Sequence, residues 1–145
     1  MKSLMTPLAL LLAMAASEAL ADTPSSPLEN ERWRSRPLIV VAPDATDATW
    51  QRFQRDLAVP ANREAFVERE MVLYTVVAGV GQRNGQALDP QATSALLSHL
   101  GVAPGGPTRL LLVGKDGGTK VDQHAPLDAR AIFATIDKMP MRQKP

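Results

Sequence analysis

Three short apolar runs, each bounded by turn or charged residues, mark the buried strands of this chain. The strands that they predict cover residues 38–42, 71–77 and 109–113. Continuous apolar runs of this length are typical of strands that are buried on both faces, as in a parallel sheet. A helical pattern separates the first two runs, so we expect these strands to be parallel and joined by a right-handed crossover.

Apolar residues at helical spacing lie between and after these runs. Trp50, Phe53 and Leu57 share one face of a first helix, which Thr46 or Asp47 can cap. A second helical piece covers residues 61–69, and a third begins at residues 89–90 and ends near residue 101, where glycine suits a helix C-terminus. A last amphipathic helix covers residues 128–139 and stops before proline.

Two glycine-containing segments connect these elements. Residues 78–88 include the spacing GxGxxxG, which differs from the dinucleotide-binding fingerprint, so we interpret the segment as a flexible turn rather than a phosphate loop. Residues 115–118 read Lys-Asp-Gly-Gly and predict a hairpin whose second strand covers residues 119–123. The predicted order is therefore β-α-β-α-β-β-α, with a mixed sheet flanked by helices.

This order resembles the thioredoxin fold from about residue 36 onward. Within residues 105–117 a Pro-Thr pair opens the third strand and a glycine-containing hairpin closes it, as in thioredoxins. The resemblance implies an α/β thioredoxin-like domain in which Pro107 is cis and faces the active site. Thioredoxins carry Cys-x-x-Cys after the first strand, but residues 43–49 here contain no cysteine.

A closer resemblance rests on three stretches together. They are Arg32-Trp33, residues 113–118 (VGKDGG) and residues 136–142 (IDKMPMR). In combination they resemble an exported bacterial family known as domain of unknown function 4174, which is similar to the C-terminal domain of sushi-repeat-containing extracellular proteins. The resemblance implies no particular activity.

The N-terminus has the pattern of a cleaved signal peptide. Lys2 precedes an apolar run over residues 7–16, too short to span a bilayer, and small residues stand at Ala19 and Ala21. We expect a signal peptide over residues 1–21, a flexible lead-in over 22–36 that is rich in proline and serine, and one domain over 37–145. The mature protein should be periplasmic or secreted.

Composition excludes several classes of function. The chain has no cysteine and a net charge of +1, so thiol chemistry is impossible and nothing attracts it generally to nucleic acid or to an anionic membrane. Its two histidines, His99 and His124, lie on separate elements without ligand spacing, so we expect no metal site and no cofactor. No membrane insertion is expected once the signal peptide has been cleaved. The expected partner is a protein or a small anionic ligand in the cell envelope.

The first candidate site lies at the end of the first strand. Asp44, Thr46 and Asp47 precede a helix N-terminus, where they can cap free N–H groups or bind a ligand, and Pro107 should lie beside them. The favoured function is a non-redox binding or interaction module, without catalysis. The alternative is a non-thiol hydrolase or transferase that uses Asp44, Thr46 or Asp47 near Pro107.

The second candidate site is the hairpin tip at Lys115 and Asp116, which is either a solvated turn or a binding surface.

Three arginines ahead of the first strand, Arg32, Arg34 and Arg36, alternate with other residues. An extended chain would place all three on one face, as a solvated edge or an anion contact. Trp33 would then point the opposite way and pack on the domain.

Overall fold

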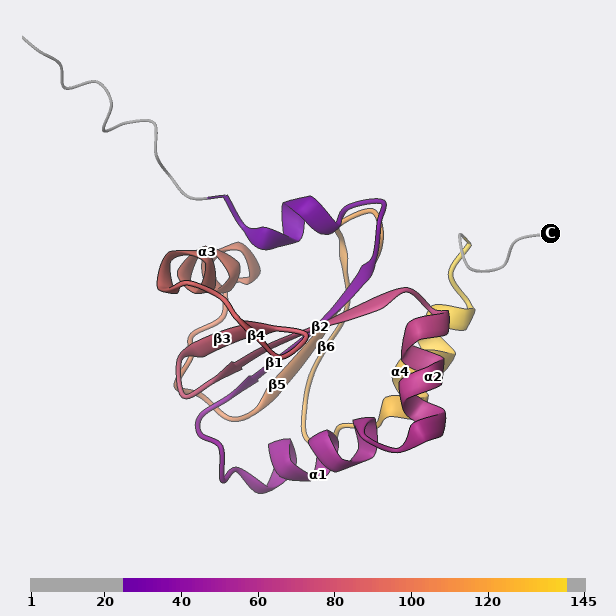
Figure 1. The fold of residues 1–145 in the computed structure, drawn as a ribbon, viewed down its shortest axis with the longest axis horizontal. Coiled ribbons are helices and arrows are strands. Elements are labelled where there is room, and N and C mark those ends of the chain that lie inside the picture. Colours follow the sequence, from indigo (N-terminus) through magenta and orange to yellow (C-terminus); the bar gives the residue numbers. More distant parts are fainter. Residues whose placement is uncertain (1–24, 141–145) are drawn as a thin grey trace, which may run out of the picture.

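A computed structural model describes residues 25–140 as a six-stranded mixed sheet between two helical layers (Figure 1). The signal-peptide prediction lies outside the described residues. In chain order the elements are η2 (Pro27–Glu31), β1 (Arg36–Ala42), α1 (Ala48–Leu57), α2 (Pro60–Glu68), β2 (Met71–Val77), β3 (Val80–Arg83), β4 (Gln86–Ala87), α3 (Pro90–Leu100), β5 (Arg109–Val113), β6 (Thr119–His124) and α4 (Ala129–Asp137).

The sheet has the order β4-β3-β2-β1-β5-β6. β1 is parallel to β2, as the crossover through α1 and α2 requires, and antiparallel to β5. β5 and β6 form the expected antiparallel hairpin, and α4 follows it. The predicted α/β, thioredoxin-like fold is therefore confirmed, with one addition between β2 and α3.

Alternating side chains of β1 supply both hydrophobic cores. Leu38 and Val40 face the layer that contains α1, α2 and α4, where Phe53 and Ile132 are fully buried. Ile39 and its neighbours on that face pack against α3 and η2. Figure 1 shows these two helical groups on opposite sides of the sheet. Burial on both faces explains why the strands read as continuous apolar runs.

The segment expected to be a flexible turn is a β-hairpin. β3 pairs with β2, and β4 pairs with β3, so the sheet extends beyond β2. Gly81 lies in β3 so close to α3 that a Cβ atom there would collide with the side chain of Thr93. Gly81 therefore reflects close packing of a strand against a helix, whereas Gly79 and Gly85 supply positive φ values of 80° and 83° at turns. The interpretation of the segment as a flexible turn was wrong.

The lead-in also differs from expectation over its described part. Residues 27–31 form the 3-10 helix η2, and Leu28 and Glu31 are buried. The chain then turns at residues 32–34 instead of running extended, because Trp33 has a positive φ of 66°. Arg32 and Arg34 consequently stay exposed while Arg36 is buried in β1, so the predicted single arginine face was wrong.

Two further expectations were wrong in detail. Trp33 is 60% exposed instead of packing on the domain. The cis peptide bond expected at Gly106–Pro107 is trans, and the cis bond among the described residues is Ala125–Pro126. Pro107 is exposed while the adjacent Thr108 is buried, so the turn is held through the threonine rather than by a proline turned inward.

Candidate functional site

The end of β1 carries the first group of predicted site residues. Asp44 accepts hydrogen bonds from the backbone N and the Oγ1 of Thr46, at 2.9 and 2.7 Å. Asp47 is the N-cap of α1, because its Oδ2 accepts a 2.9 Å hydrogen bond from the backbone N of Trp50. Of the two caps that the sequence allowed, the structure selects Asp47.

The antiparallel pairing of β1 with β5 brings the Pro107 turn to the same edge. Val41 lies opposite Arg109, so Thr108 reaches Asp47 and donates a 2.5 Å hydrogen bond from its Oγ1 to Asp47 Oδ2. The predicted proximity of Asp47 to the Pro107 turn is therefore found. Asp44 and Thr46 stay in an exposed turn of their own.

The electrostatics of Asp47 favour a fixed carboxylate. The hydrogen bond from Thr108 and the backbone hydrogen bond from Trp50 hold the pKa of Asp47 below its ordinary value, although partial burial opposes them. A carboxylate with a lowered pKa is a poor proton donor near neutral pH, whereas a general acid needs a raised pKa. This arrangement ties the start of α1 to the start of β5.

A cavity of about 350 Å³ lies along α1 close to this edge of the sheet. It is lined by residues of α1 and of the 125–127 loop, and none of Asp44, Thr46, Asp47 or Pro107 lines it. The strand-end residues therefore have capping geometry and no cavity of their own among those described for residues 25–140.

The second predicted site lies at the opposite end of β5, because Lys115 and Asp116 follow Val113. Lys115 Nζ lies 2.9 Å from both carboxylate oxygens of Glu70, and its side chain is only 13% exposed. Asp116 accepts hydrogen bonds from the backbone N of Gly118 and from Lys120 Nζ, which hold its pKa below the ordinary value.

These hairpin residues line a cavity of about 400 Å³ between the hairpin and the C-terminal end of α4. Its lining comprises Arg36, Gly114, Lys115, Asp116, Lys120, Thr135, Lys138, Met139 and Pro140. Arg36, Lys120, Thr135 and Lys138 were not among the predicted site residues. For Lys120, Thr135 and Lys138 the sequence signal was their membership in, or nearness to, the three stretches that carry the family resemblance. Arg36 was noted in the sequence only as one of three alternating arginines that could contact an anion.

Those three stretches converge at this cavity. The backbone N of Trp33 donates a 2.7 Å hydrogen bond to the carbonyl of Lys115. The side chain of Arg32 lies against Gly117, whose positive φ of 89° shapes the hairpin. The hairpin and residues 138–140 then share the cavity lining. Segments from both ends of the domain therefore meet at one place.

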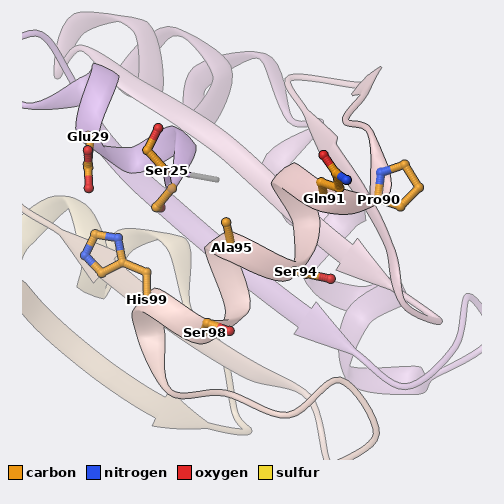
Figure 2. Close-up of a pocket in the computed structure, with 9 residues that line it drawn as sticks. Ser25, Glu29, Pro90, Gln91, Ser94, Ala95, Ser98 and His99 are labelled. Atoms are coloured by element: carbon orange, nitrogen blue, oxygen red, sulfur yellow. The ribbon is translucent and has the colours of Figure 1, made fainter. Parts of the chain in front are cut away.

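A larger and more open hollow, of about 810 Å³, lies between η2 and α3. Figure 2 shows its lining side chains, which are mostly small or hydroxyl-bearing and come from both elements. Within the part of the chain that the structure describes, His99 and Glu29 are the only ionisable residues that line it. The hydroxyl of Ser26 already accepts a hydrogen bond from the backbone N of Leu28, as the cap of η2. The hollow has no cluster of groups suited to chemistry.

A buried polar cluster joins η2 to the sheet. Glu31, 5% exposed, accepts hydrogen bonds from Tyr74 at 2.5 Å, Ser35 at 2.7 Å and Arg83 at 2.8 Å. Burial alone would raise the pKa of Glu31, but these hydrogen bonds outweigh it and lower the pKa. Burial and the Glu31 carboxylate raise the pKa of Tyr74. The cluster is satisfied internally, which is typical of a structural anchor.

The histidines lie apart in the structure too. His124 Nδ1 is 3.1 Å from the carbonyl oxygen of Thr108, whereas His99 lies on α3. Within residues 25–140, no three His, Cys, Asp or Glu side chains gather as a metal site would require. In the same part of the chain, no helix combines the length and hydropathy needed to cross a bilayer.

Comparison with known proteins gives a family and no activity. A search of curated proteins found no match. A family model described as "Domain of unknown function (DUF4174)" matches residues 27–145, which include η2 and all six strands. The stretches at Arg32-Trp33, the β5–β6 hairpin and the end of α4 all fall inside this match. The chain therefore belongs to the DUF4174 family.

Proposed function

We propose that this protein is an exported, non-redox binding module built on a thioredoxin-like domain. Export is supported by the signal-peptide pattern of residues 1–21, which would place the domain in the periplasm or outside the cell. Membership of the thioredoxin-like superfamily, and similarity to the C-terminal domain of sushi-repeat-containing proteins, are parts of the same proposal. The thioredoxin-like fold supports them, but a fold alone does not fix a function.

One observation carries the proposal. At the helix N-terminus after β1, where thioredoxins hold their reactive cysteines, this chain has the Asp47 cap bonded to both Trp50 and Thr108. With no cysteine in the sequence, no thiolate is available for disulfide exchange. The residues at this position stabilise the domain, which leaves the hairpin side of the molecule as the better candidate for binding.

The alternative, a hydrolase or transferase centred on Asp47, has less support. Such a mechanism requires a carboxyl group with a raised pKa beside a cavity. The pKa of Asp47 is lowered, mainly by Thr108, and the cavity along α1 is lined by other residues. We therefore place the function in binding rather than catalysis.

The test is a pull-down with tagged protein expressed from the full sequence, incubated with the envelope fraction of its native host. We expect a partner that is retained by the Asp44→Ala/Asp47→Ala variant and lost by the Lys115→Ala/Asp116→Ala variant. The unfolding midpoint of each variant is measured alongside, so that loss of folding is not mistaken for loss of binding.

An enzymatic result would contradict the proposal. Hydrolysis of p-nitrophenyl acetate or p-nitrophenyl phosphate above a heat-treated control, abolished by Asp47→Asn in a folded variant, would favour the hydrolase. A partner lost only by the strand-end variant would keep the binding function but move its site to Asp44 and Asp47.

A further inference from the structure

The cavity between the β5–β6 hairpin and α4 has an unusual balance of charge. Among the described residues 25–140, four of its lining side chains are basic and one is acidic, namely Arg36, Lys115, Lys120, Lys138 and Asp116. Over the whole chain the balance is only +1, so this excess is local to the cavity. Clefts lined by one sign of charge concentrate ligands of the opposite sign.

Nearby negative groups do not cancel this excess. Glu70 pairs with Lys115 from outside the lining, and Asp137, the residue before Lys138, forms an ion pair with Arg69. Two positive charges therefore remain in the balance. The C-terminal end of α4 adds about half a negative charge at most, from its aligned peptide dipoles. A dianion therefore matches the remaining charge better than a monoanion does.

Three of the four basic groups are held in place by hydrogen bonds or ion pairs. Arg36 is 2% exposed and donates a 2.8 Å hydrogen bond from Nη1 to the carbonyl of Arg69. Lys115 is fixed by Glu70, and Lys120 by Asp116 at 3.0 Å. Lys138 follows the last turn of α4 and is exposed. Fixing these side chains before a ligand arrives reduces the entropy that binding must overcome.

The rest of the lining is suited to the uncharged part of a ligand. Met139 and Pro140 form an apolar wall beside the basic groups, and Thr135 adds a hydroxyl. A volume of about 400 Å³ falls within the range of small-molecule sites, which are apolar with a few well-placed polar groups.

We infer that this cavity binds a small organic dianion, with its charged group at the lysines and Arg36 and its apolar part against Met139 and Pro140. This inference rests on the proposed binding function and specifies its ligand class. Phosphate monoesters and dicarboxylates share the required charge and size, and the experiment below separates them.

The test is NMR titration of ¹⁵N-labelled protein, expressed from the full sequence, with phenyl phosphate and with phthalate. Benzoate and benzyl alcohol are the controls for charge, since they keep the aromatic ring with one negative charge or none. Inorganic phosphate is the control for the apolar part, which it lacks. We expect saturable shifts for at least one dianion at the amides of Gly114, Lys115 and Met139, and none at Asp47 or Thr108. The dianion with the lower Kd identifies the headgroup.

Lys138 gives the sharpest variants because its side chain is exposed and lies just beyond α4. Lys138→Gln should weaken dianion binding about threefold and Lys138→Glu about tenfold, since each step removes one unit of positive charge beside the ligand. The matched control is Arg130→Gln, which removes a charge at the opposite end of α4 and should leave Kd unchanged. Lys120→Gln tests the same effect from the hairpin.

Several results would overturn the dianion site. The first is the absence of saturable shifts at about 10 mM ligand, a concentration well above the millimolar Kd of a weak fragment. The second is equal affinity for phenyl phosphate and inorganic phosphate. The third is an unchanged Kd in both Lys138→Glu and Lys120→Gln. Binding that appears only after deletion of residues 141–145 would also overturn it, because the intact chain would then close the cavity. The pull-down tests the binding function separately, so a partner recovered there would stand even if every dianion failed.

Discussion

Asp47 shows how one side chain at this chain's candidate site is committed to structure. Its Oδ2 accepts hydrogen bonds from the N-terminus of α1 and from Thr108 at the start of β5. Two elements that are distant in sequence are thereby fixed to one carboxylate. The sequence predicted both the cap and the nearness of the Pro107 turn, because strand ends and helix starts converge in this fold.

We expect Asp47→Ala to lower the free energy of unfolding by about 1–2 kcal/mol, since a lost N-cap alone costs about 1 kcal/mol. The control Asp44→Ala should cost less than about 0.5 kcal/mol, because Asp44 is exposed and bonds only within its own turn. Urea denaturation measures both values. Equal losses in the two variants would show that neither the N-cap nor the Thr108 contact of Asp47 contributes measurably to stability.

The pKa of Asp47 also predicts a pH dependence. Its folded-state pKa is lowered by Thr108 first and Trp50 second, so its ionised form stabilises the fold at any pH above the unfolded-state pKa. That contribution is lost as the pH falls through the folded-state pKa. Asp47→Asn should therefore show a smaller loss of stability than the wild type between neutral pH and acid pH, in denaturation curves recorded at matched salt.

At the scale of elements, the apolar runs predicted β1, β2 and β5 because all three strands are buried on both faces. The β3–β4 hairpin was missed for the opposite reason. Only Gly81 is buried in β3, so no alternation of apolar side chains marks it as a strand. Likewise η2 is fixed by Glu31, whose partners Tyr74 and Arg83 lie far along the chain and give no local signal.

Gly81→Ala tests whether that glycine serves packing. The added methyl group would lie 2.3 Å from the Oγ1 and 3.1 Å from the Cβ of Thr93, and rotation of the Thr93 side chain does not move its Cβ away. Overpacking of this kind costs about 1–3 kcal/mol. The control Gly105→Ala has nothing within 4 Å of its new Cβ and should change stability by less than about 0.5 kcal/mol. Similar thermal unfolding midpoints for both variants would refute the close-packing explanation.

The Glu31 cluster and an exposed ion pair provide a matched comparison. Glu31→Ala removes the partner of Tyr74 and Arg83 and should lower the free energy of unfolding by about 3 kcal/mol. This value is at the low end for a broken buried ion pair, because the Arg83 side chain is 45% exposed. Asp122→Ala breaks the bidentate contact with Arg109 on the exposed strand β6 and should cost less than about 1 kcal/mol. Guanidinium denaturation distinguishes the two, and a Glu31 cost below that of Asp122 would contradict the anchoring role.

At the scale of the whole molecule, the sequence predicted the order of elements but only part of the candidate site. Lys115 and Asp116 stand out locally as a hairpin tip. Arg36 and Lys138 join them only after α4 has packed against the face of the sheet that contains Leu38 and Val40 of β1. A cavity formed by segments so distant in sequence has no local pattern, so it had to be found in the structure.

The proposed export leads to a prediction for the whole chain. The exported protein should begin at Asp22, because small residues at Ala19 and Ala21 suit signal peptidase. Intact-mass spectrometry of the secreted or periplasmic fraction measures this. Ala21→Leu should leave an uncleaved precursor, whereas the neighbouring Leu20→Ala should be processed normally. Mature protein that retains residues 1–21 would contradict the prediction.

The central position of β1 has a consequence for when the protein can fold. One edge of β1 pairs with β2, but the other pairs with β5, where Leu38 lies opposite Leu112. Contacts between such distant residues form slowly, because the long loop between them must close, and lose conformational entropy, before the contacts can stabilise the fold. During synthesis, which proceeds from the N-terminus, β1 therefore lacks its second neighbour, β5, until most of the chain has been made. For the proposed export, late closure of this kind would keep the chain in a state that can still be threaded across a membrane, so that folding would follow translocation.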